Sequence, residues 1–172
     1  MKHCSFNSKG FTLLEVLVST AVIGILATLS SVILINTIRS ANKANITNEA
    51  KENLSLVAEL LTRDVRESKS VTLNSSTSLQ LNYSDGSIVN WTCTAPGAGA
   101  NGYVSRNAVT VTNKDPQEGV SYSNCLFLLS GSAGSQIVTL NLTLTEGAGT
   151  AGRPQDLGVT VSQPITAFVR NY

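Results

Sequence analysis

Ionisable side chains are scarce in this chain of 172 residues, and histidine is nearly absent. Charged residues make up 13%, about half of the roughly 25% that is usual in globular proteins. The only histidine is His3, next to the first residue, which argues against a Ser-His-Asp or Cys-His enzyme. Three cysteines cannot by themselves supply the four ligands of a structural zinc site. The sequence therefore predicts a protein that is not an enzyme and that has no cofactor or metal.

An excess of charge of either sign is also missing. Lys and Arg number 12 and Asp and Glu 11, so nucleic acid is not an obvious partner. Arg106, Arg153 and Arg170 are scattered along the chain and form no basic stripe. Hydrophobic residues still reach 42%, which argues against disorder. The length suffices for one domain of about 100–150 residues with an appendage.

The hydrophobic residues are concentrated in one run. Between Phe11 and Ile35 the only charged residue is Glu15. At about 1.5 Å per residue, about 20 apolar residues cross a ~30 Å hydrocarbon core, so residues 11–35 are predicted to span a membrane as a helix. A cleavable secretory signal would have a shorter apolar region of about 7–15 residues. A carboxylate inside such a span costs up to about 3 kcal/mol and usually marks a function.

The helix is predicted to continue beyond the membrane span, to about residue 68. No proline or glycine occurs between Ile38 and Ser68. Apolar residues recur there at spacings of three or four, which is typical of a helix with one apolar stripe. These residues are Ile46, Ala50, Leu54, Val57, Leu61 and Val65. Residues 36–68 are therefore predicted to be amphipathic and to lie on a sheet.

From Ser70 onward the apolar period changes to two, which is typical of β-strands. The predicted strands are Val71–Leu73, Ser78–Tyr83, Ser87–Thr92, Ala108–Thr112, Cys125–Leu129, Gln136–Thr145 and Gly158–Val161. Residues 84–87 (SDGS) are a hairpin signal, and Pro96–Gly102, Ser130–Gly134 and Gly147–Gly152 are predicted loops. A long helix followed by antiparallel strands is an α+β arrangement, with residues 69–172 as a β-rich domain.

The segment KGFTLLEVLV (residues 9–18) resembles the class III signal of type IV prepilins and type II secretion pseudopilins. In that family a prepilin peptidase removes a short basic leader after its glycine and methylates the new N-terminal residue, usually Phe. The resemblance implies that residues 1–10 are the leader, that Gly10 and Phe11 flank the cut, and that Phe11 is N-methylated. It also implies a pilin-like fold, with the long helix packed on a C-terminal antiparallel β-sheet.

Glu15 becomes the fifth residue of the mature chain under this resemblance. In the family its partner is the N-terminal ammonium of a neighbouring subunit, which gives Glu15 a role in assembly. Two alternatives remain open from the residues alone. Glu15 lies one helical turn from its own N-terminus and can pair there, or its carboxylate can extend to the membrane surface.

Two cysteines, Cys93 and Cys125, remain after removal of the leader, because Cys4 leaves with it. An oxidising compartment would pair them, and a disulfide closing a loop of this length contributes about 3–4 kcal/mol. The alternative is two buried free thiols. A further hypothesis, a Ca²⁺ site in the acidic loop Asn113–Gly119, rests on only two carboxylates.

Together these patterns predict a minor pilin or pseudopilin, a structural subunit of a type IV pilus or of a related secretion or competence filament. The implied partners are other pilin subunits, the prepilin peptidase, the membrane and an inner-membrane assembly platform. The chain is expected in the inner (cytoplasmic) membrane with its C-terminal domain outside the cytoplasm, and then in the filament. The alternative function is a membrane-tethered binding or sensor domain that does not polymerise.

Overall fold

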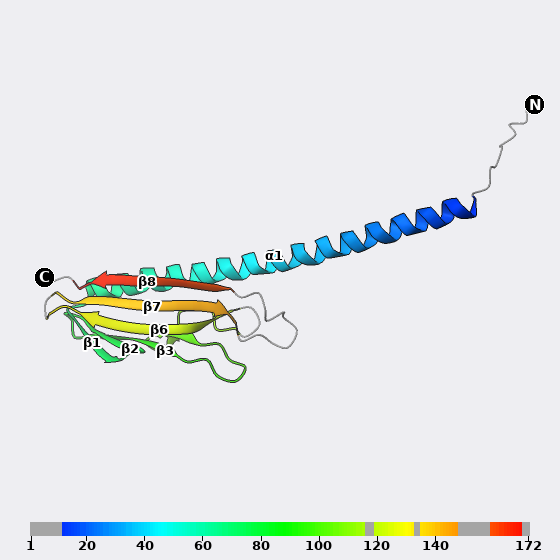
Figure 1. Cartoon of the computed structure of the whole chain (residues 1–172). Helices are drawn as coiled ribbons and strands as arrows, with labels where there is room; N and C mark the ends of the chain where they lie inside the picture. The colour runs from blue at the N-terminus through cyan, green and yellow to red at the C-terminus, as the bar shows by residue number, and fades with distance from the viewer. Residues whose placement is uncertain (1–11, 116–118, 133–134, 148–158, 170–172) are drawn as a thin grey trace, which may run out of the picture. The chain divides into compact units, whose positions relative to one another are not determined.

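The computed structural model describes residues 12–115, 119–132, 135–147 and 159–169 (Figure 1). One helix, α1 (Leu13–Glu67), precedes strands that form antiparallel sheets, so the predicted α+β class is confirmed. The chain divides into two compact units, Met1–Ala41 and Asn42–Tyr172, and the division falls within α1. The finer boundaries predicted from the sequence, at residues 10, 35 and 68, stay predictions.

The strands form two sheets in which neighbours in sequence are neighbours in space. The first sheet has the order β1-β2-β3-β4-β5 and the second the order β6-β7-β8, and all pairs are antiparallel. The strands are β1 (Ser70–Ser75), β2 (Ser78–Asn82), β3 (Ile88–Thr94), β4 (Tyr103–Arg106), β5 (Val109–Thr110), β6 (Val120–Ser130), β7 (Ile137–Glu146) and β8 (Thr160–Phe168).

A single sheet was expected, and the segment between β5 and β6 explains why there are two. The backbone N–H of Asn113 donates to Asn53 Oδ1 at 2.7 Å, and Asn113 Nδ2 donates to Glu49 Oε1 at 2.7 Å. Both acceptors belong to α1. The chain is therefore fastened to the helix after β5, and β6 starts a new sheet.

The strand predictions differ from the structure mainly at the edges. β4 was not predicted, because Tyr103–Arg106 has too few apolar residues for a period of two to be visible. The predicted strand Ala108–Thr112 shortens to β5, because Asn107 and Ala108 form a tight turn with φ of 48° and 64°. β8 extends well beyond Val161 and contains Pro164, which an edge strand tolerates because it lacks an N–H. Most of the predicted loop Gly147–Gly152 lies outside the described residues.

The core is one cluster to which α1 and both sheets contribute. The six stripe residues predicted on the helix, from Ile46 to Val65, are all buried. The alternating residues of β7 are buried as well, and Trp91 of β3 and Phe127 of β6 are the largest side chains with no exposed surface. Burial of apolar surface contributes about 25 cal/mol per Å², so this cluster stabilises the second unit.

Hydrogen bonds also join the two sheets where β1 lies near β6. The Gln136 side-chain amide accepts from Val71 N at 3.0 Å and donates to Val71 O at 3.2 Å, as a neighbouring strand would. The backbone N–H of Phe127 donates to Ser76 O at 2.7 Å. The edge of β1 is thereby covered, so the two sheets form one folding unit.

Candidate functional site

Glu15 lies in the first turn of α1, whose start is set by Thr12. The backbone N–H of Glu15 lies 3.3 Å from Thr12 Oγ1 and 3.1 Å from Thr12 O. A threonine at the N-cap followed three residues later by a glutamate is a capping-box pattern, and the helix dipole favours a carboxylate at this end. The ion pairs of the described residues are those of Asp64 with Arg63 and Arg106, so Glu15 has no cationic partner within this part of the chain.

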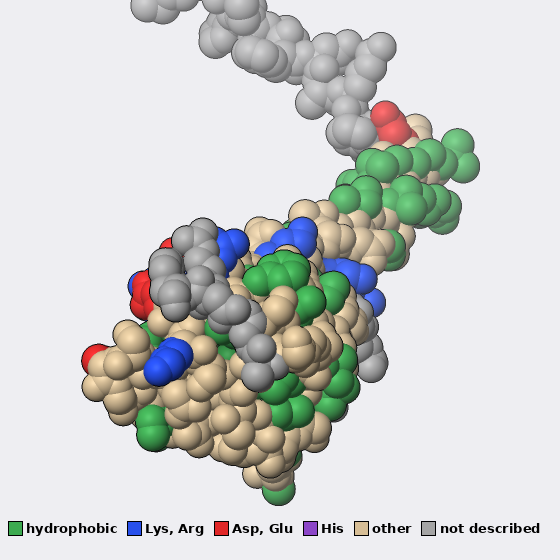
Figure 2. Space-filling view, turned by 90° about the vertical axis from the view of Figure 1, so that its left-hand side faces the viewer, with side chains coloured by type: hydrophobic (Ala, Val, Ile, Leu, Met, Phe, Trp, Pro, Cys, Tyr) green, Lys and Arg blue, Asp and Glu red, His purple; other side chains and the backbone are tan. Residues whose placement is uncertain are grey.

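The residues that follow Glu15 present apolar side chains on every side of the helix. Each residue from Thr12 to Asn45 is exposed, including Leu14, Leu26 and Ile33 at 72%, 57% and 66%. Figure 2 shows hydrophobic side chains in green along this part of the helix. By length and composition α1 is able to cross a membrane. Such a surface is unfavourable in water, so it requires lipid or apolar protein neighbours.

Six hydroxyl groups between Ser19 and Thr37 are satisfied within the helix itself. Each donates to a backbone carbonyl three or four residues earlier, at 2.7–3.0 Å. The residues are Ser19, Thr20, Thr28, Ser30, Ser31 and Thr37. A hydroxyl with a partner in its own helix does not need water, so these residues are compatible with hydrocarbon or with a packed bundle. Between Leu13 and Ile35, Glu15 is the one charged side chain.

Cys93 and Cys125 form a disulfide, with their Cα atoms 6.3 Å apart. Cys93 belongs to β3 and Cys125 to β6, so the bond joins the two sheets. Both residues are nearly buried, at 6% exposed. This position is structural, because the bond fastens the sheets across the core instead of closing a surface loop.

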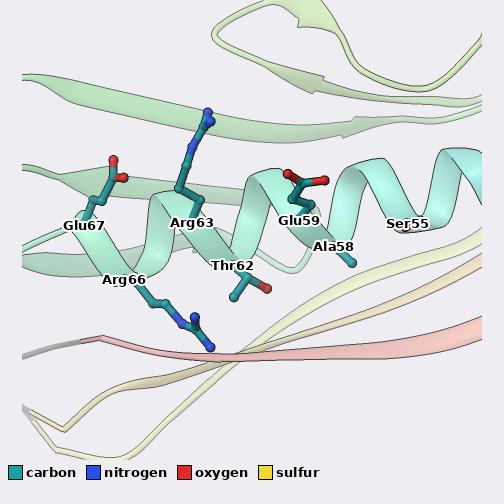
Figure 3. Close-up of a pocket in the computed structure, with 7 residues that line it drawn as sticks. All are labelled: Ser55, Ala58, Glu59, Thr62, Arg63, Arg66 and Glu67. Carbon is teal, nitrogen blue, oxygen red and sulfur yellow. The ribbon is translucent and has the colours of Figure 1, made fainter.

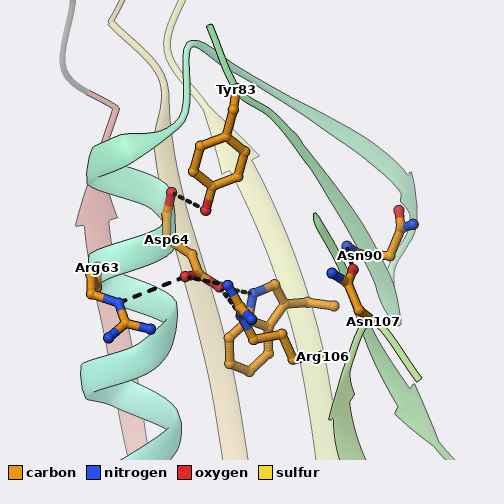
Figure 4. A network of polar contacts seen from close by, with 7 residues as sticks. Arg63, Asp64, Tyr83, Asn90, Arg106 and Asn107 are labelled. Carbon is orange, nitrogen blue, oxygen red and sulfur yellow. Dashed lines mark hydrogen bonds and ion pairs between the residues drawn. The ribbon is translucent and has the colours of Figure 1, made fainter. Parts of the chain in front are cut away.

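A buried carboxylate, Asp64, connects the end of α1 to the first sheet (Figure 4). Its side chain is 2% exposed. Arg106 of β4 donates from Nε to Oδ2 at 2.6 Å and from Nη2 to Oδ1 at 3.1 Å. Trp91 Nε1 donates to Oδ2 at 3.0 Å, and Tyr83 Oη donates to the Asp64 carbonyl at 3.3 Å. We call these four residues the Asp64 cluster.

The electrostatics of the Asp64 cluster follow from these contacts. The hydrogen bond to Asp64 raises the pKa of Arg106 above its usual range. Burial raises the pKa of Tyr83, and the negative charge of Asp64 raises it further. Arg106 therefore stays charged and Tyr83 stays neutral at physiological pH, which is the state that keeps every donor in place. The Asp64 carboxylate is 2% exposed and accepts from both Arg106 and Trp91, so the cluster fastens the helix end to the first sheet.

The sequence analysis did not identify the Asp64 cluster. Asp64 was not singled out there, and Arg106 was one of the scattered arginines. One signal was available: Asp64 lies three residues after Leu61 and seven after Val57, which places it on the buried stripe. A carboxylate at a stripe position predicts a buried cationic partner, although it does not say which one.

A hollow of about 680 Å³ lies along the other side of this helix end (Figure 3). Its lining is formed by Ser55, Ala58, Glu59, Thr62, Arg63, Arg66 and Glu67. In Figure 3 Arg66 points toward β8, whereas Arg63 points away from it. Two arginines and two glutamates line this hollow, so it selects no ligand of one charge. Within the described residues no three His, Cys, Asp or Glu side chains group as a metal site requires, and Glu118 of the hypothetical Ca²⁺ loop lies outside them.

Gly10 and Phe11, the residues predicted to flank the cut, lie outside the described residues. A family model described as the prokaryotic N-terminal methylation motif matches residues 5–31, which include both of them and Glu15. No curated protein and no solved structure matches the chain. The match ends within the apolar part of α1, so it does not cover the second unit. The chain thus carries the N-terminal methylation motif, the class III signal peptide of type IV pilins, at its N-terminus.

Proposed function

We propose that the chain is a minor pilin or pseudopilin, a non-enzymatic subunit of a type IV filament system. The observation that carries the proposal is the segment from Thr12 to Asn45, which is exposed on all sides and largely apolar, while six of its hydroxyl groups are bonded within the helix. A membrane anchor alone would account for the apolar surface. The methylation motif and the carboxylate of Glu15 add the features of a subunit that assembles.

The physical basis of assembly is a transfer between two apolar environments. In the bilayer the segment contacts lipid, and in a bundle of helices it contacts the same segment of its neighbours. Hydrocarbon and apolar side chains are similar solvents, so the transfer itself is nearly balanced in free energy. Small differences in free energy then decide whether the segment stays in the bilayer or enters the bundle. An ion pair that forms only in the bundle is one such difference.

Glu15 provides that ion pair in the proposal. Removal of residues 1–10 creates a positive N-terminus at Phe11, four residues before Glu15 in the sequence. An unpaired charge in an apolar environment is costly, so an ammonium of one subunit and the carboxylate of the next stabilise each other when the helices pack. The pair also fixes the axial position of each subunit, because any shift along the bundle separates the charges.

The proposal requires a processed chain in a filament, and both parts are measurable. Cleavage after Gly10 removes 10 of the 172 residues and leaves 162, beginning with N-methylated Phe11. We expect that mass in protein extracted from membranes of a host with active prepilin peptidase, and the processed chain in the sheared filament fraction. Gly10→Ala, which changes only the residue before the cut, is the control and should stay at full length. A processed wild-type chain that never enters filaments would instead indicate a membrane-tethered domain.

A further inference from the structure

The side chains of β1, β2 and β3 that face away from the core form a surface of amides and hydroxyls. We call it the amide face and define it by Ser70, Thr72, Asn74, Gln80, Asn82 and Asn90. These residues alternate along the strands with buried ones such as Leu79 and Leu81, and each is exposed or half-buried. The antiparallel register brings Thr72, Gln80 and Asn90 side by side across three strands. The face therefore belongs to a rigid sheet and not to a loop.

The amide groups of this face are held in place by one another. Asn74 Nδ2 donates to Gln80 Oε1 at 3.4 Å, Gln80 Nε2 donates to Asn82 Oδ1 at 3.0 Å, and Asn82 Nδ2 donates to Ser70 Oγ at 3.4 Å. An amide has two N–H donors and two acceptor lone pairs, so each of these bonds uses only part of its capacity. The rest of this capacity is available to a ligand, and the bonds among the side chains lower the entropy cost of binding one.

The amide face is uncharged in a unit whose helix is strongly charged. None of the residues of β1, β2 and β3 is ionisable, and the nearest charges in sequence are Lys69 before β1 and Asp85 in the β2–β3 turn. In contrast, residues 42–67 of α1 include Lys51, Glu52 and Arg66 among many charged side chains. In Figure 2 the lower part of the globular unit, where Figure 1 has β1–β3, is mostly tan, the colour of the backbone and of side chains that are neither hydrophobic nor charged.

We propose that the amide face binds an uncharged, hydroxyl-rich polysaccharide. A ligand that covers the face removes water from amides and hydroxyls, and each of these groups must regain a hydrogen bond. Sugar hydroxyls both donate and accept, so they match amides in either direction. An anionic or cationic ligand would lose its hydration and meet no opposite charge. Ile88, 50% exposed and in register with Asn82, provides apolar contact for the C–H surface of a sugar ring. The proposal does not depend on assembly into a filament.

The test uses the full processed chain in a zwitterionic detergent, because detergents with sugar headgroups would compete. The chain is passed over immobilised dextran, amylose and mannan, which are neutral, and over alginate, which is acidic. We expect retention on at least one neutral polymer, unchanged between low and high salt because no ion pair contributes, and no retention on alginate. Gln80→Glu adds a charge without a change in size and should weaken the retention about tenfold or more.

Two further variants keep the result interpretable. Thr166→Glu places the same charge on the exposed side of β8 and should leave binding unchanged. Asn74→Asp repeats the test at a more exposed position of the amide face, in case Gln80→Glu lowers the melting temperature. The proposal is overturned if no neutral polymer retains the chain, if only alginate does, or if Thr166→Glu weakens binding as much as Gln80→Glu. Sedimentation that shows a wild-type dimer abolished by Gln80→Glu would also overturn it, since the face would then bind a second copy.

Discussion

The two parts of α1 belong to one continuous helix but differ in what surrounds their apolar side chains. Between Leu13 and Ala41 every side chain is exposed, whereas between Ile46 and Val65 the apolar stripe is buried in the core. Among the described residues, none between 13 and 41 is buried, so the apolar surface of the first part is available to lipid or to other helices. The second part holds two sheets together. Under the proposed function, one helix therefore separates assembly from folding along its length.

The largest expected effect comes from a matched pair of leucines, one in each part. Leu61 has no exposed surface and Leu26 is 57% exposed. Leu61→Ala should destabilise the second unit by about 2–5 kcal/mol, because it removes buried contacts and leaves a cavity. Leu26→Ala should leave the melting temperature of the processed chain in detergent unchanged. Equal destabilisation by both variants would contradict the separation.

Removal of the disulfide is expected to affect the second unit and to leave the exposed first part of α1 unchanged. Cys93→Ala combined with Cys125→Ala should lower the stability of that unit by about 3–4 kcal/mol, because the unfolded chain gains entropy. The wild-type chain from the cell envelope should resist alkylation until it is reduced. Insertion into the membrane should not change, since both cysteines lie outside the apolar segment. Rapid labelling of both thiols without reductant would show that the bond is not formed in the cell.

Asp64 marks the point where the helix is fastened to the first sheet. Asp64→Asn keeps the shape but removes the charge opposite Arg106, and it should destabilise the second unit by about 3 kcal/mol. This is the low end of the range for a broken buried pair, because the Arg106 side chain is 33% exposed. Thermal unfolding measures the effect, and Glu52→Gln, on the exposed side of the same helix, is the control.

The Asp64 cluster also gives the second unit a dependence on alkaline pH. The pKa of Tyr83 is raised by burial and by Asp64, so the folded state favours the neutral phenol. The contribution is complete below the unfolded pKa near 10.0 and is lost as the pH rises through the raised folded value. Tyr83→Phe should reduce this loss in a pH series of unfolding temperatures. An unchanged alkaline slope would exclude Tyr83 as its source.

These residues show how far the sequence alone could lead. The stripe from Ile46 to Val65 and the alternation of β7 are periodic, and a period is a local signal that predicts both the element and its buried side. The pair of Asp64 and Arg106 spans 42 residues, and no local pattern connects them. The division into two sheets depends on the bond between Asn113 and Glu49, which are 64 residues apart. No local pattern in the sequence connects these two residues either. Local periodicity therefore predicted the helix and the strands with their buried sides. The polar contacts that fix how these elements pack together became visible only in the structure.

Ala108 is expected to give the smallest effect. It adopts a left-handed conformation, with φ of 64°, in the turn between β4 and β5, where glycine is favoured. Ala108→Gly should stabilise the second unit by at most about 1 kcal/mol, because relief of strain is partly offset by the greater freedom of the unfolded chain. A lower melting temperature would mean that the turn is not strained.

The central claim is that the first part of α1 serves assembly and the second part serves folding, and Glu15→Ala tests it most directly. The variant removes the carboxylate that the proposed neighbouring ammonium needs and creates no clash, since Glu15 is exposed. Incorporation into sheared filaments and the melting temperature of the second unit are measured on the same variant, with Glu52→Ala as the control. The account predicts a sharp loss of incorporation with unchanged melting. Full incorporation, or a lowered melting temperature with incorporation intact, would contradict it.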